Sequence, residues 1–253
     1  MILLRDNIDY RDNIVIPHNR ASIGFILCPT DKTFNSDILS VGIEDVELTF
    51  SFKASNHIHP LERNAELELE SIKDASAAIT PSSDLDVVFF VGGCMSALVG
   101  TTKVLEAVRA GAPSAMVSSL YTATQRATRA VNAKRISVAT SYDAKINALI
   151  SQTFDSFGIE VLNCQSIPIS NSLDFSSISK QKIRKFVLSL DRADADAIVI
   201  CSTTVRAMET IEEIENIAGK PVLCSNQMAI WDALRSAGVS DRIDGYGSLL
   251  RDY

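Results

Sequence analysis

The stretch DVVFFVG, Asp86–Gly92, has a counterpart later in the chain in DAIVICS, Asp196–Ser202. Each begins with Asp, continues with five apolar residues (one of them Cys in the second copy), and ends on a small residue before a helical pattern. Short apolar runs of this kind are typical of parallel strands covered on both faces. A second pair agrees, since IGFILCPTD ends at Asp31 and ISVATSYD ends at Asp143. The two pairs predict two similar halves.

Strand and helix patterns alternate through the rest of the chain, and this alternation implies parallel sheets with helices on both faces. We therefore predict an α/β fold with two pseudo-symmetric Rossmann-like lobes. The first lobe is expected to comprise residues 20–117 and 230–253, and the second residues 118–229. Ligands of open α/β sheets bind beyond the carboxyl ends of the strands. We therefore expect a small pocket between Gly92 and Ser202.

The composition excludes several classes of protein. Of the 253 residues, 46% are apolar and 22% are charged, which is typical of a globular protein. The net charge of −7 provides no basic face for phosphates, so nucleic acid is not an expected partner. No apolar stretch has the length that a membrane span requires. The beginning, MILLRDNIDYRDN, is charged within five residues and does not resemble a signal peptide, so we expect a cytoplasmic protein.

Cysteine and histidine usage gives little sign of a metal site. The five cysteines are scattered and form no C-x-x-C pair, which argues against both disulfides and zinc. The alternating pair His57 and His59 allows either a two-histidine metal site or a solvated loop, and we expect no metal. The chain has neither G-x-G-x-x-G nor G-x-x-x-x-G-K-[ST], which disfavours a nucleotide-binding domain.

Five segments, taken in order, carry a resemblance to a known superfamily. They read IGFILCPTDKTFNSD, LDVVFFVGGCMSALVG, RISVATSYDAKIN, KPVLCSNQMAIWDALRSAGV and GYGSLL. Together they resemble the aspartate/glutamate racemase superfamily, and within it the branch of maleate cis-trans isomerases, arylmalonate decarboxylases and ectoine-utilisation proteins. The resemblance runs from about Ser22 to the C-terminus. It implies two lobes with the site between them, a small carboxylate or dicarboxylate as ligand and no cofactor, and we also expect a homo-oligomer.

The chemistry implied by this resemblance uses two cysteines, one from each lobe, on either side of a substrate carbon. A thiol, with an ordinary pKa of about 8.5, suits either an acid or a base. Maleate isomerases add one thiolate to the double bond, and arylmalonate decarboxylases keep only the second cysteine, with glycine at the first position. This chain departs from the two-cysteine pattern, since the first position reads Gly92 and the second, in STTVR, reads Ser202.

Cys94 lies two residues beyond Gly92, and two interpretations of it stay open. A shift of two residues would bring Cys94 to the thiol position, as the similarity of CMS to the usual Cys-Thr-Ser suggests. Otherwise Cys94 lies in the turn that opens the next helix, where the family has a hydroxyl that donates to a carboxylate. There it is either a reactive thiol, because helix N-termini favour thiolates, or an inert small residue.

Hydroxyl and amide side chains gather on the loops that follow the strands. Such loops bind carboxylates through hydroxyl and backbone N–H donors, although Ser, Thr and Asn also cap helices. Tyr142 joins Cys94 and Ser202 as a catalytic candidate, because capping does not explain a tyrosine at the start of a helix. The predicted substrate-binding residues are Thr30, Asp31, Gly92, Gly93, Ser96, Ser118, Ser119, Thr203, Thr204 and Asn226.

These residues favour a cofactor-independent isomerase of the maleate cis-trans isomerase or Asp/Glu racemase type, acting on a small carboxylate or dicarboxylate. One alternative is a cofactor-free decarboxylase of the arylmalonate type. Another is a binding protein that has lost the chemistry and retains affinity for a small acid. The absence of both usual thiols is the weakness of the enzyme hypotheses, and turnover of small acids distinguishes them from the binding protein.

Overall fold

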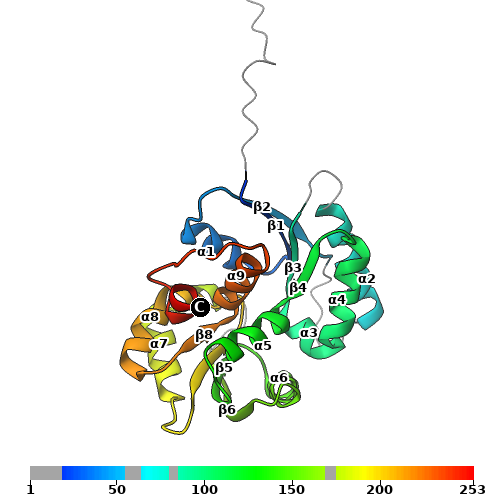
Figure 1. Ribbon diagram of the computed structural model, residues 1–253. Coiled ribbons are helices and arrows are strands. Elements are labelled where there is room, and N and C mark those ends of the chain that lie inside the picture. Colours follow the sequence, from blue (N-terminus) through cyan, green and yellow to red (C-terminus); the bar gives the residue numbers. More distant parts are fainter. Residues whose placement is uncertain (1–18, 55–63, 80–84, 169–174) are drawn as a thin grey trace, which may run out of the picture.

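The computed structural model describes residues 19–54, 64–79, 85–168 and 175–253. Its strands form two parallel sheets, with the order β2-β1-β3-β4 in the first and β6-β5-β7-β8 in the second (Figure 1). Because the two orders correspond strand for strand, the prediction of an α/β fold with two similar halves is confirmed. The strands are β1 (Ala21–Leu27), β2 (Val46–Phe52), β3 (Val87–Val91), β4 (Met116–Ser119), β5 (Arg135–Thr140), β6 (Glu160–Ser166), β7 (Ala197–Cys201) and β8 (Val222–Cys224).

Helices cover both sheets and fill the space between the lobes. In the first lobe α2 and α4 pack on each other and on the strands, whereas α5 and α9 pack together where the lobes meet (Figure 1). The helices are α1 (Phe34–Val41), α2 (Ala65–Ile79), α3 (Gly93–Val99), α4 (Thr101–Gly111), α5 (Leu120–Ala130), α6 (Ala144–Ser156), α7 (Lys180–Ser189), α8 (Ile211–Ala218), α9 (Ser225–Ser236) and α10 (Ser248–Asp252). Two short 3-10 turns, Phe175–Ser177 and Met208–Thr210, complete the described part.

The aspartate at the start of each repeated stretch accepts the same kind of hydrogen bond in both lobes. Asp86 Oδ2 accepts a hydrogen bond from the backbone N–H of Ser22, 2.9 Å away, at the start of β1. Asp196 Oδ2 accepts from the backbone N–H of Arg135, 2.8 Å away, at the start of β5. Each aspartate therefore satisfies a donor at the beginning of the neighbouring strand, which explains why the repeat begins with Asp.

The second repeated pair, Asp31 and Asp143, begins helices. Asp31 Oδ1 accepts from the backbone N–H groups of Thr33 and Phe34, at 3.0 and 3.1 Å. Asp143 Oδ1 accepts from those of Lys145 and Ile146, at 2.8 and 3.0 Å. Both carboxylates thus satisfy N–H groups that a helix start leaves without partners, and both favour the positive end of the helix dipole.

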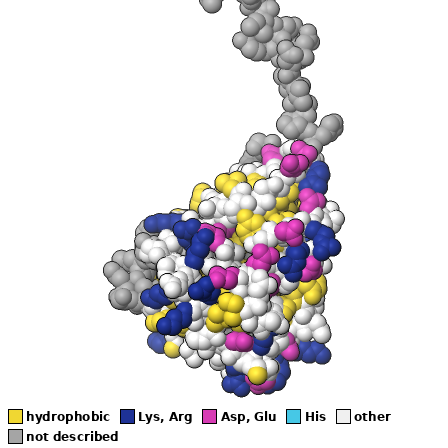
Figure 2. All heavy atoms as spheres, turned by 90° about the vertical axis from the view of Figure 1, so that its left-hand side faces the viewer, with side chains coloured by type: hydrophobic (Ala, Val, Ile, Leu, Met, Phe, Trp, Pro, Cys, Tyr) yellow, Lys and Arg dark blue, Asp and Glu magenta, His cyan; other side chains and the backbone are white. Residues whose placement is uncertain are grey.

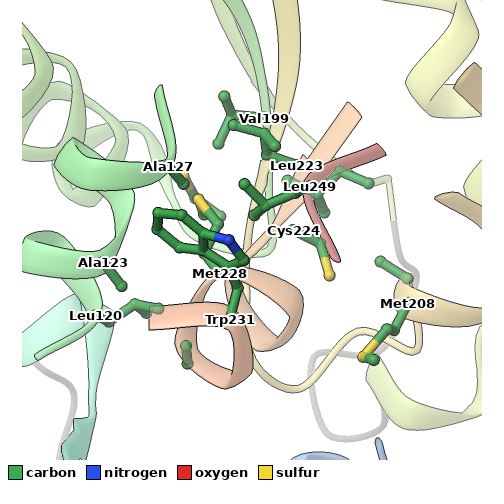
Figure 3. Close-up of a cluster of buried hydrophobic side chains, with 14 of the residues drawn as sticks. Leu120, Ala123, Ala127, Val199, Met208, Leu223, Cys224, Met228, Trp231 and Leu249 are labelled. Carbon is green, nitrogen blue, oxygen red and sulfur yellow. The ribbon is translucent and has the colours of Figure 1, made fainter. Parts of the chain in front are cut away.

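A continuous hydrophobic core joins the lobes through α5 and α9. Small residues of α5 face the larger side chains Met228 and Trp231 of α9, and β8 adds Leu223 and Cys224 (Figure 3). The Trp231 side chain is only 8% exposed, and its indole N–H donates to the Tyr253 carbonyl oxygen at 3.1 Å. Burial of an aromatic side chain of this size contributes about 1.5–3 kcal/mol, so this contact helps to hold α9 in the core that joins the lobes.

The surface shows no preference for one sign of charge on the face drawn in Figure 2, where basic and acidic side chains are mingled. Ion pairs among the described residues include Arg206 with Glu209 and Arg184 with Glu213. Among the described helices none is long and apolar enough to span a membrane. In the same part of the chain, no group of three or more His, Cys, Asp or Glu could hold a metal ion. His18, His57 and His59 lie outside the described residues.

Candidate functional site

Gly92 and Ser202 occupy matching places at the ends of the central strands. β3 ends at Val91, which pairs with Leu27, and β7 ends at Cys201, which pairs with Thr140. Gly92 and Ser202 are the next residues in each lobe, as the repeated stretches predict. Cys94 is the second residue of α3, beyond the strand, and its half-buried side chain packs against the core that joins the lobes.

The space that a side chain at position 92 would need is filled by Phe90. A Cβ atom built on Gly92 would lie 2.2 Å from the Phe90 ring, which is too close for any real contact. The backbone angles of Gly92, φ −144° and ψ 83°, are open to other residues, so space and not conformation requires glycine. Ser202 has no such obstacle, and its Oγ lies 2.8 Å from Ser141 Oγ and 3.2 Å from Thr204 Oγ1.

The turns after β1 and β7 are joined directly. The Thr203 carbonyl oxygen accepts from Thr33 Oγ1 and from Asn226 Nδ2, the latter at 3.1 Å. Asn226 Nδ2 also donates to Asp37 Oδ2 at 2.6 Å. Burial raises the pKa of Asp37 to about 6, and the hydrogen bond from Asn226 partly opposes this effect. These bonds hold the first lobe's α1 against the turn that follows Ser202.

Tyr142 lies in the turn between β5 and α6, and α6 packs against α3 of the first lobe. Its pKa is raised well above the ordinary phenol value, first by burial and next by the charges that Cys94 and Cys201 would carry. Charges on Cys28 and Asp31 also raise the pKa of Tyr142. Side chains of both lobes therefore surround this phenol, which keeps its proton at neutral pH and can donate a hydrogen bond.

Several predicted binding residues have partners elsewhere in the protein. Buried Ser118 donates to Asp232, which also accepts from Arg126 at 2.8 Å. Ser119 Oγ lies 3.1 Å from Thr122 Oγ1, and Ser96 Oγ donates to the Gly92 carbonyl oxygen at 2.8 Å. Ser118 and Ser96 donate their hydroxyl protons within the protein and have none left for a carboxylate, whereas either hydroxyl of the Ser119–Thr122 pair can be the donor.

The remaining predicted residues lie around the two strand ends. Gly93 opens α3 and is half-buried, whereas Thr30 is exposed in the turn after β1. Thr203 and Thr204 follow Ser202 directly, and Asn226 begins α9 with Ser225. The sequence did not predict Thr33 and Asp37, which contact Asn226, or Ser141, which contacts Ser202. A local signal existed for Thr33, since it lies two residues after Asp31, but none existed for the bond between Asp37 and Asn226.

A family model described as arylmalonate decarboxylase matches residues 66–250. The chain belongs to the arylmalonate decarboxylase family. Over 184 residues it is 25% identical to the arylmalonate decarboxylase of Bordetella bronchiseptica, covering 70% of this chain and 73% of that protein. It is also 25% identical over 149 residues to the maleate isomerase of Nocardia farcinica, covering 58% of this chain. That match spans only 59% of the Nocardia protein.

Solved structures of both kinds of family member share the fold. A mutant of Nocardia farcinica maleate cis-trans isomerase with a covalently bound succinylcysteine intermediate has a TM-score of 0.81 at 18% identity, covering 92% of this chain and 99% of that one. A crystal structure of arylmalonate decarboxylase has a TM-score of 0.77 at 21% identity, covering 90% and 98%. The predicted resemblance to maleate isomerases and arylmalonate decarboxylases is thereby confirmed.

Proposed function

We propose that the protein is a cofactor-independent isomerase of the maleate cis-trans isomerase type, acting on a small carboxylate or dicarboxylate. One observation carries the proposal: Cys94, which follows β3, and Tyr142, which follows β5, come from different lobes and lie near enough that a charge on Cys94 acts on the Tyr142 phenol. Ser141, the neighbour of Tyr142, contacts Ser202. At this place the fold offers a thiol, a phenol that keeps its proton, and the hydroxyls of Ser202 and Thr204. The N–H groups of the turns add further donors for a carboxylate.

Isomerisation of a double bond is a reaction that a single thiol can complete. The Cys94 thiolate adds to one alkene carbon, and the π electrons move to the other carbon and into its carboxylate. Tyr142, Ser202 and Thr204 donate to that carboxylate as its charge grows. The former double bond, now single, rotates; the electron pair then returns and expels the thiolate. No proton is gained or lost overall, so a base on the opposite face is not required.

Racemisation makes a different demand, because it needs an acid on one face of the carbon and a base on the other. Gly92 has no side chain, and the Ser202 hydroxyl forms hydrogen bonds with the hydroxyls of Ser141 and Thr204, neither of which is a base. An alkoxide at Ser202 would need an adjacent base. Symmetric two-base racemisation is therefore expected to be very slow.

Decarboxylation of the arylmalonate type is the second candidate. The glycine at position 92 favours it, because the resemblance implies glycine at the first thiol position of those decarboxylases. Ser202 opposes it, since the cysteine that donates the proton in them belongs at that position. In this case Cys94 would have to supply the proton to the carbanion, from the first lobe.

The test is incubation of the purified protein with maleate, aryl-substituted malonates, aspartate and acids of the ectoine pathway, followed by proton NMR. Conversion of a cis acid into its trans isomer supports the proposal, and loss of carbon dioxide from a malonate supports the second candidate. Binding without turnover of any acid contradicts both and identifies a binding protein.

Four further features remain proposals. The lobes comprise residues 20–117 with 230–253, and 118–229; the packing of α9 on β3 and β4 supports assigning residues after 230 to the first lobe. We also infer a cytoplasmic protein and a homo-oligomer. Membership of the ectoine-utilisation branch rests on the Thr-Asp pair at Thr30 and Asp31.

A further inference from the structure

Asp31 offers one carboxylate oxygen that the protein does not use. Its Oδ1 accepts from the N–H groups of Thr33 and Phe34 at the start of α1, at 3.0 and 3.1 Å. Its Oδ2 is buried and has no hydrogen-bond partner. A buried acceptor without a donor costs about 1–3 kcal/mol, so such an atom calls for an explanation.

A second acceptor of this kind belongs to Asn226, whose side chain is almost fully buried, with 1% of the residue exposed. All the hydrogen bonds of its amide group leave from Nδ2, toward Asp37, Thr203 and Thr33. Its Oδ1 is buried and receives no hydrogen bond. Two side chains of one neighbourhood, Asp31 in the turn after β1 and Asn226 at the start of α9, therefore present acceptors that lack donors.

Thr33 contacts both side chains through their other polar atoms, which places the two groups in one neighbourhood. Its Oγ1 lies 3.4 Å from Asp31 Oδ1 and 3.3 Å from Asn226 Nδ2. The carboxylate of Asp31 also belongs to the candidate site, because its negative charge acts on both Tyr142 and Asp37 and raises the pKa of each. Arg206, whose charge acts on Asp37, pairs with Glu209.

We propose that the site binds a small amino acid, with a carboxylate at one end and an ammonium group that donates to Asp31 Oδ2 and Asn226 Oδ1 at the other. The inference rests on the proposed function for the carboxylate end, which Tyr142, Ser202 and Thr204 receive. An ammonium has three donors and no acceptor, so it suits two oxygens without donors. A second carboxylate at this place would meet the charge of Asp31 and be repelled.

The test compares the affinities of three acids with the same carbon chain: succinate, γ-hydroxybutyrate and γ-aminobutyrate. Titration calorimetry of the whole protein should give γ-aminobutyrate the highest affinity, at least about tenfold above succinate, and γ-hydroxybutyrate an intermediate one. Asp31→Asn keeps an oxygen for the helix start and removes the charge, so it should reduce the ratio of the two affinities at least about tenfold.

Asp143→Asn is the matched control, because Asp143 begins α6 in the same way that Asp31 begins α1. It should leave the ratio unchanged. Equal affinity for succinate and γ-aminobutyrate, or an unchanged ratio in Asp31→Asn, overturns this inference and leaves the proposed function standing. If none of the acids binds, the proposed function and this inference both fail. The ratio in the unaltered protein decides the question even if Asp31→Asn does not fold.

Discussion

The strand ends of the two lobes share one backbone plan and differ in their side chains. In both lobes an aspartate satisfies the start of the neighbouring strand, and a second aspartate begins the helix after the first strand. The backbone N–H of Lys53 donates to Leu27 at 3.0 Å, and that of Ile167 donates to Thr140 at 2.8 Å, so even the residues after the edge strands correspond.

The reactive side chains at the strand ends differ between the two lobes. The first lobe has a glycine at the strand end, with Cys94 in the following helix and the charged Asp31 nearby. The second lobe has Ser202 at the strand end, linked to Ser141 and Thr204, with the protonated Tyr142. The hydrogen bonds that shape the backbone are retained in both lobes, whereas the thiol able to attack a substrate lies in the first lobe and the phenol and hydroxyls that can donate to a carboxylate lie in the second. Two lobes with the same fold therefore contribute different groups to the reaction.

The largest expected difference concerns the reactivity of the thiols. Cys94 is half-buried in the first turn of α3, while Cys201 is buried in β7 and its pKa is raised far above the ordinary value by burial. Because the thiolate is the nucleophile, iodoacetamide should label Cys94 at least ~100-fold faster than Cys201 in the folded protein. Peptide mass spectrometry over time measures both rates. Labelling of Cys201 before Cys94 would reverse the assignment of the two cysteines.

The second prediction removes the thiol of the first lobe. Cys94→Ala should reduce turnover of a true substrate by at least ~100-fold, the contribution expected of one nucleophile or proton donor. Carboxylate binding should stay within about tenfold, a change of ~1.4 kcal/mol. Cys164→Ala, at the half-buried edge strand β6, is the control and should keep its activity. Full activity of Cys94→Ala would show that Cys94 is only a turn residue.

The third prediction concerns the junction between the lobes and depends on pH. The pKa of Asp37 is raised from 3.8 to about 6, so the folded state holds this proton more tightly than the unfolded state. Asp37 therefore favours folding most below pH 4, and this contribution is lost as the pH rises to about 6, by on the order of 3 kcal/mol.

Asp37→Asn should abolish that dependence, because the amide oxygen still accepts from Asn226 and carries no charge. Urea unfolding of both proteins between about pH 4 and pH 7 measures the difference in the free energy of unfolding, which should grow as the pH rises. A constant difference across this range would mean that Asp37 ionises without penalty in the folded protein.

The smallest expected effect is the difference in stability between two variants that each place a cysteine at one of the matching strand ends. Gly92→Cys must displace the buried Phe90 ring, and overpacking of this kind costs about 1–3 kcal/mol. Ser202→Cys only weakens the hydrogen bonds with Ser141 and Thr204, at a cost of about 1 kcal/mol. Thermal unfolding should therefore show the lower midpoint for Gly92→Cys. Equal midpoints would mean that Phe90 moves aside freely.

The sequence was informative wherever the determining interactions are local. Apolar runs such as Val87–Val91, and aspartates such as Asp31 and Asp143 two residues before a helical N–H group, are read from neighbouring residues, so the fold and the strand ends could be predicted. The hydrogen-bond partner of each hydroxyl could not be predicted. Ser118 donates to Asp232, 114 positions away, and Asp37 accepts from Asn226, 189 positions away. No local pattern distinguishes a hydroxyl that awaits a ligand from one with a distant partner.

A crystal structure with a bound, unreactive acid would show whether Cys94 of the first lobe attacks while the second lobe binds the carboxylate. The carboxylate should lie at the turn formed by Ser202, Thr203 and Thr204, near Tyr142. Cys94 Sγ should then be in van der Waals contact, within about 4 Å, with the adjacent carbon of the acid. An acid whose carbons contact Ser202 but stay out of reach of Cys94, or one bound in the groove lined by Arg20, Asp241 and Tyr246, would contradict it.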